Sequence, residues 1–123
     1  MNFIFFFPDE MRASCVSCFG NSVVKMPNYD RLASEGVCFD DCSVQNPVCS
    51  PSRCCTMTGL YPHNNGHRTL WHLLRPHEPN LFGYLKDAGY DIAWYGKNDL
   101  FSQELLDEYC ADISEKRNGY KSM

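Results

Sequence analysis

The chain begins with an unbroken apolar run over residues 2–7, which Pro8 ends. An apolar run without polar alternation is typical of a strand buried on both faces of a parallel sheet. The mixed apolar stretch over residues 37–44 predicts a second strand, and residues 91–95 predict a third.

Helical signals lie between and after these runs. Helices are predicted over residues 29–35, 51–58, 80–88 and 103–109. Gly36 and Gly59 directly follow the first two, where a left-handed cap is needed. Ser50 is the expected N-cap of the second helix, with Pro51 at its first position. A proline, asparagine and glycine cluster over residues 61–66 predicts a turn.

Strands that alternate with helices indicate an α/β fold with a mostly parallel sheet flanked by helices. The chain has 123 residues, of which 44% are hydrophobic, so it can hold one modest core and no second domain. Residues 114–123 are polar and carry no apolar run that would complete the sheet. The expected fold is therefore a truncated one.

The net charge of the chain bears on which partners it can bind. The net charge is −4, from 15 acidic and 11 basic residues, which argues against nucleic-acid binding. The opening apolar run is too short for a signal peptide or a membrane span. We expect no membrane partner and a cytoplasmic location.

Eight cysteines would indicate disulfides in an exported protein, but the expected compartment is reducing, so most are interpreted as thiols. The pairs Cys15/Cys18 and Cys38/Cys42 have spacings that a structural zinc site could use. The second pair falls in a predicted strand rather than on a turn. Cysteine is also a common small core residue, which is the favoured interpretation.

Polar groups follow each predicted strand, where ligands bind to parallel sheets. They are the pair Asp9 and Glu10, then Cys49, then Lys97. Cys49 precedes a predicted helix, whose free N–H groups favour an anion or a thiolate. Arg53 lies four residues later on the same face, so the two residues predict an anion cradle with a nucleophile at its centre. A buried cysteine beside a solvated arginine is the plainer alternative.

The motif around this pair is longer. C-S-P-S-R at residues 49–53, followed by T-G at 58–59, resembles the C-x-P-S-R-x4-T-G signature of type I sulfatases. Further segments resemble the same family in the same order: P-D-E-M-R at 8–12, P-N-Y-D-R-L-A-S-E-G-V-C-F at 27–39, Q-N-P-V at 45–48, and the G-Y and G-K pairs at 89–90 and 96–97. Several independent motifs in order make chance matching improbable.

The resemblance implies an alkaline-phosphatase-like fold and a formylglycine made from Cys49 by a maturation enzyme. The aldehyde hydrate attacks the sulfur of a sulfate ester, the alcohol leaves, and the second hydroxyl expels sulfate. Arg53 would hold the hydrate and the anion, and Lys97 would contact the sulfate. Asp9, with Glu10, would bind Ca²⁺ or another divalent metal.

Two features depart from the family pattern. Asp99 stands where a histidine is frequent, so we expect it to contact the substrate or carry a proton. The downstream metal ligands of the family have no counterpart in this chain. His67, in the loop after the cradle, is a weaker candidate for substrate contact, since loop polar residues are usually only solvated.

These observations predict residues 1–123 to be the N-terminal part of a sulfatase catalytic domain, inactive in isolation. The expected partners are a sulfate-ester small molecule or saccharide and the formylglycine-generating enzyme. The same cradle would serve a phosphonate monoester or phosphodiester hydrolase. Two other classes stay open, a non-catalytic truncated chain and a zinc-stabilised binding module.

Overall fold

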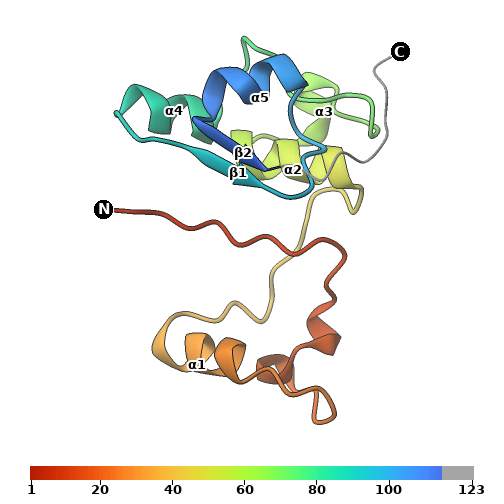
Figure 1. Cartoon of the computed structure of the whole chain (residues 1–123). Coiled ribbons are helices and arrows are strands. Elements are labelled where there is room, and N and C mark those ends of the chain that lie inside the picture. Colours follow the sequence, from red (N-terminus) through yellow and green to blue (C-terminus); the bar gives the residue numbers. More distant parts are fainter. Residues whose placement is uncertain (115–123) are drawn as a thin grey trace. The chain divides into compact units, whose positions relative to one another are not determined.

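The computed structural model describes residues 1–114, which fall into two compact units, residues 1–43 and the part of the chain from residue 44 onward (Figure 1). The first unit contains the short 3-10 helices η1 (Ala13–Cys15) and η2 (Ser17–Phe19) and the helix α1 (Pro27–Glu35). The second contains α2 (Cys49–Thr58), α3 (Pro62–Asn65), α4 (Leu81–Asp87), β1 (Ala93–Tyr95), α5 (Gln103–Tyr109) and β2 (Asp112–Ser114).

Helix α1 confirms the helix predicted in the first unit, with a proline in its first turn. The Ser17 hydroxyl donates to the Asp30 carboxylate at 2.6 Å and so ties η2 to this helix. Gly36 ends α1 as predicted, but its φ is −118°, so the predicted left-handed cap is wrong. The Gly36 N–H donates to the Leu32 carbonyl in an ordinary helical bond, and no positive φ is required.

The two strands predicted in the first unit are not formed. Residues 2–7 are irregular and exposed, with Ile4 93% exposed, and residues 37–44 are also irregular, with Phe39 72% exposed. A buried parallel strand is stable only between neighbouring strands and under covering helices. The sheet in the described residues consists of β1 and β2 alone, and neither apolar segment pairs with it or with the other.

The second unit contains a small parallel α/β arrangement, as the alternating pattern predicted. Strands β1 and β2 pair in parallel, with Trp94 opposite Ile113, and α5 is the helix that connects them. Strand β1 is shorter than the predicted 91–95, and β2 was not predicted at all. Strand β2 lies where the polar tail was expected to begin, and the rest of that tail, 115–123, lies outside the described residues.

The core of this unit is built from α2, the loop before α4, and the β1–α5–β2 segment. Its buried members are Cys54, Met57, Leu74, Ile92, Leu100, Phe101, Leu105, Leu106 and Cys110. Phe101 is at its centre, with the Phe82 ring edge-on at 5.2 Å and the Tyr109 ring at 5.3 Å between centroids. The core therefore fixes the loop that precedes Phe101.

Helix α2 begins two residues earlier than predicted, at Cys49, so the N-cap is Val48 and not Ser50. Ser50 is instead fully buried, and its hydroxyl donates to the Leu70 carbonyl at 3.2 Å. At the other end Gly59 adopts the predicted left-handed conformation, with φ 71°. The turn predicted over residues 61–66 is in fact the one-turn helix α3, which ends at the left-handed Gly66.

All eight cysteines are thiols, and no cluster of three or more potential metal ligands occurs within residues 1–114. None of the helices in that range has both the length and the apolar character needed to cross a bilayer.

The burial of Cys54 makes the free energy of unfolding depend on pH. Burial, followed by the nearby charge of Glu78, raises the pKa of the Cys54 thiol from 9.0 to about 12. Above pH 9 the unfolded chain loses this proton while the folded chain keeps it, so the free energy of unfolding falls as the pH rises from 9 towards 12. We expect a fall of up to about 1.4 kcal/mol per pH unit in urea titrations. Cys54→Ala should flatten this slope, and an unchanged slope would contradict the assignment.

Candidate functional site

Helix α2 places the first two candidate residues. Cys49 is its first residue and is partly exposed, at the positive end of the helix dipole. Arg53 follows one turn later and is only 5% exposed. The sequence had placed Cys49 ahead of the helix and Arg53 in its first turn. The earlier helix start moves both residues deeper into α2, yet keeps them on neighbouring turns of the same helix.

The loop after β1 brings Lys97 to this pair. Gly96, with φ 93°, turns the chain out of the strand. The Lys97 ammonium then donates to Cys49 Sγ at 3.4 Å, and the Arg53 guanidinium donates through Nη1 to the Lys97 carbonyl at 3.3 Å. Three candidate residues separated by up to 48 positions are therefore in direct contact.

Asn98 holds this loop in shape. Its side chain is buried, and Oδ1 accepts the N–H groups of Leu100 and Phe101 at 3.1 and 2.9 Å. Its Nδ2 donates back to the Phe101 carbonyl at 2.8 Å. Sequence reasoning did not single out Asn98, although an Asn-Asp pair between a glycine and two apolar residues is a turn signal.

Asp99 lies beside Lys97, with Oδ2 3.1 Å from the ammonium. Its φ is 48°, a left-handed conformation that aspartate tolerates better than most residues. The candidate site of the second unit thus consists of a partly exposed sulfur, two cations and one carboxylate. Such a group can bind an anion at the sulfur, because the cations outnumber the carboxylate.

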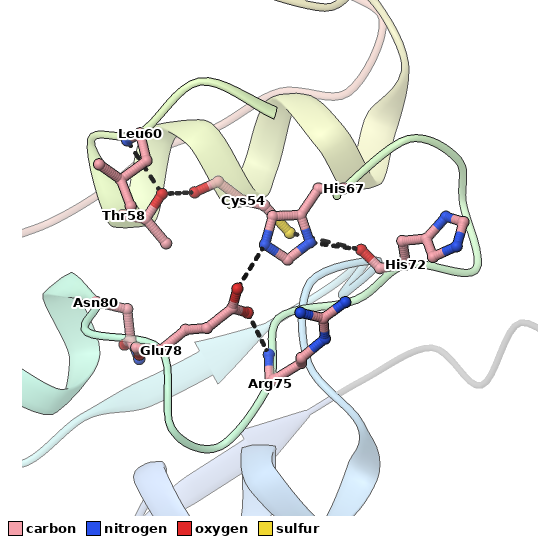
Figure 2. Close-up of polar contacts among 8 residues, drawn as sticks. All are labelled: Cys54, Thr58, Leu60, His67, His72, Arg75, Glu78 and Asn80. Carbon is pink, nitrogen blue, oxygen red and sulfur yellow. Dashed lines mark hydrogen bonds and ion pairs between the residues drawn. The ribbon is translucent and has the colours of Figure 1, made fainter. Parts of the chain in front are cut away.

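His67 has a different setting (Figure 2). It is 3% exposed, with Nδ1 2.9 Å from the His72 carbonyl and Nε2 3.2 Å from Glu78 Oε1. The second Glu78 oxygen accepts the Arg75 N–H at 2.7 Å. Both ring nitrogens are therefore used inside the fold, and the structure does not bring His67 together with Cys49 and Lys97.

The contacts of His67 fix the position of one of its hydrogens. A carbonyl oxygen only accepts, so Nδ1 carries a hydrogen. One further hydrogen must lie between Nε2 and Glu78 Oε1, held by either atom. His67 and Glu78 together form a buried pair that anchors the loop between α3 and α4. Glu78 was not among the sequence candidates, because nothing local distinguishes it from a surface glutamate.

The carboxylates proposed for metal binding are in the first unit. Asp9 and Glu10 form an exposed bend after residues 2–7, and Glu10 has a φ of 57°. Carboxylate oxygens are the donors that Ca²⁺ prefers, but a calcium ion takes about six to eight oxygens. These two residues fit the ion as part of a ligand set.

Comparison with known proteins identifies the family of this chain. A family model described as Sulfatase matches residues 1–121, nearly the entire chain. The chain belongs to the sulfatase family. The match covers every segment on which the resemblance in the sequence was based.

Individual sulfatases agree with this assignment. The chain is 35% identical over 102 residues to an N-acetylglucosamine-6-O-sulfatase of Bacteroides thetaiotaomicron, a match that covers 83% of this chain and 18% of that protein. It is 36% identical over 107 residues to the human steryl-sulfatase, with 78% and 18% covered. This sulfatase chain therefore spans about a fifth of the length of the relatives it matches.

A solved structure confirms the fold. BT4656 in complex with its substrate D-glucosamine-2-N,6-O-disulfate is 35% identical, with a TM-score of 0.72 over 77% of this chain and 19% of that one. The sulfatase fold assigned from the sequence is thus confirmed for the part of the fold that this chain contains.

The His67–Glu78 pair gives a stability test for the sulfatase chain. Glu78→Ala leaves His67 Nε2 and the Arg75 N–H without partners, so we expect a loss of about 3 to 5 kcal/mol in the free energy of unfolding. Glu78→Gln is the matched control, since its amide can donate to Nε2 and accept from Arg75. Its loss should stay below about 1.5 kcal/mol. Equal losses in urea titrations would contradict this hydrogen-bond assignment.

Asn98 gives a second test. Asn98→Ala removes the acceptor of two N–H groups, those of Leu100 and Phe101, so we expect a loss of about 2 to 4 kcal/mol. Asn98→Asp keeps this acceptor but turns a second oxygen towards the Phe101 carbonyl, so at neutral pH it should also destabilise the chain. At a pH low enough to protonate the carboxyl, which can then donate to that carbonyl, its loss should be clearly smaller than that of Asn98→Ala. A variant Asn98→Ala as stable as the parent chain would show that the loop does not depend on this side chain.

Proposed function

We propose that the chain is the nucleophile-bearing part of a sulfate-ester hydrolase. The observation that carries the proposal is the chain of contacts that joins three residues of the sulfatase motifs, from Arg53 to the Lys97 carbonyl and from the Lys97 ammonium to Cys49 Sγ. Sulfate esters are the substrates named for the relatives, and a sulfated glucosamine is the substrate bound to BT4656. The proposed substrate class is a sulfate monoester, with sulfated saccharides included.

Cys49 is the residue that a maturation enzyme would convert to formylglycine. It is partly exposed at the first turn of α2, where a maturation enzyme can reach it. The hydrated aldehyde supplies a nucleophilic hydroxyl and a second hydroxyl for product release. Lys97, which donates to Sγ, is placed to donate to an oxygen carried by the same carbon.

Arg53 and Lys97 have separate tasks in this proposal. Arg53 is buried and donates to the Lys97 carbonyl, so it supports the lysine backbone and adds positive charge to the site. The Lys97 side chain is more exposed and contributes the ammonium that pairs with a sulfate oxygen. The two cations stabilise negative charge that moves onto the transferred group.

The metal belongs to the proposal as well. Asp9 and Glu10 would contribute oxygen ligands to a divalent cation, with Ca²⁺ as the first choice for carboxylates. Such an ion would polarise the sulfate oxygens. The remaining ligands are proposed to come from the part of the relatives' length that this chain does not span.

Conversion of Cys49 is the direct test. Co-production with a formylglycine-generating enzyme should lower the intact mass by about 18 Da, the difference between a thiol and an aldehyde residue. Peptide mapping should place the change at Cys49, and Cys49→Ala should abolish it. Cys15→Ala is the matched control and should leave conversion unchanged. An unmodified Cys49 would contradict the proposal.

Turnover separates the alternatives. The converted chain, or a longer protein that contains it, is assayed on an aryl sulfate and on an aryl phosphonate with Ca²⁺ present. Hydrolysis of the sulfate supports the proposal. Hydrolysis of the phosphonate alone would favour a phosphonate monoester hydrolase, and the lack of both activities in the converted longer protein would favour a non-catalytic role.

A further inference from the structure

The ammonium that faces the candidate nucleophile is shared with a carboxylate. Lys97 Nζ lies 3.4 Å from Cys49 Sγ and 3.1 Å from Asp99 Oδ2. The two ion-pair side chains are 29% and 31% exposed, so the contact is partly shielded from solvent. Any anion that binds at the sulfur therefore shares this ammonium with Asp99 and lies near a like charge.

The loop backbone holds Asp99 beside Lys97. Asn98 closes a turn over Leu100 and Phe101, two buried core residues, and its side chain makes three hydrogen bonds within that turn. Asp99 lies inside the turn in its left-handed conformation. The fold therefore holds the Asp99 backbone next to Lys97, and the Asp99 carboxylate lies 3.1 Å from the ammonium.

The carboxylate reduces the positive potential at Cys49, and its repulsion grows with the charge of the incoming group. A doubly charged group is repelled about twice as strongly as a singly charged one at the same place. Sulfate monoesters carry one negative charge on the transferred group, whereas phosphate monoesters carry two near neutral pH. Phosphodiesters and phosphonate monoesters carry one.

We propose that Asp99 is a specificity-determining residue, which lowers the positive charge of the cradle and so shifts its preference away from doubly charged tetrahedral esters and towards singly charged ones. This inference rests on the proposed function for its substrates. Because Asp99 acts through charge, it would discriminate sulfate monoesters from phosphate monoesters but not from phosphodiesters.

The thiol of Cys49 allows a test that needs no conversion and no turnover. The 123-residue chain is alkylated with iodoacetate, which is an anion, and with iodoacetamide, which is neutral, and the rate at Cys49 is read by peptide mapping. The ratio of the two rates reports the potential at the sulfur. Asp99→Asn, which keeps the size and tolerates the left-handed backbone, should raise this ratio about three- to tenfold.

Two variants complete the design. Asp87→Asn in α4 makes the same change of net charge at an exposed position outside the site and should leave the ratio unchanged. Lys97→Met removes the cation and should lower the ratio. If Asp99→Asn leaves the ratio at the parent value, the proposal is overturned. A change in access to the sulfur alone would give this result, because it changes both rates by the same factor.

The substrate preference is tested on the converted enzyme. Asp99→Asn should raise kcat/KM for an aryl phosphate relative to an aryl sulfate by a similar factor, and a constant ratio would overturn the assignment of specificity. A failure of the proposed function is distinguishable from this result. It would appear as an unconverted Cys49 or a lack of sulfate turnover, while the alkylation ratio would still respond to Asp99.

Discussion

The candidate site depends on a partly buried contact between distant parts of the chain, the bond from the Arg53 guanidinium to the Lys97 carbonyl. It spans 44 residues and joins the second turn of α2 to the loop after β1. Arginine is costly to bury unless its donors find acceptors, so α2 and this loop are held in one relative position. That position brings the Lys97 ammonium to Cys49, and the buried core and the turn closed by Asn98 hold the same loop from its other end.

The sequence predicted the elements whose signals are local. Helix α5 matches its predicted range, α4 differs only at its ends, and Gly59 ends α2 in the conformation that its lack of a side chain permits. The contact of Cys49 with Lys97 was also predicted, from the edge that parallel strands share, but the strand expected before Cys49 is not formed, and helix α2 places this residue instead. The helices and their ends require only near neighbours.

The predictions that failed required distant partners. Residues 2–7 and 37–44 have the composition of strands, but a strand forms only where other strands supply its hydrogen bonds, and the described sheet is β1 and β2 alone. Strand β2 was missed for the opposite reason, since three residues with one apolar side chain carry no pattern of their own. His67 looked like a solvated loop residue until the fold placed Glu78 and the His72 carbonyl around it.

The residues around Cys49 and the carboxylates proposed as metal ligands lie in different units of the chain. Cys49, Arg53, Lys97 and Asp99 all belong to the unit that has its own buried core, and their mutual geometry is fixed by α2, β1 and the turn that Asn98 closes. Asp9 and Glu10 belong to the other unit. The charge balance at Cys49, two cations against one carboxylate, is consequently a property of the second unit itself.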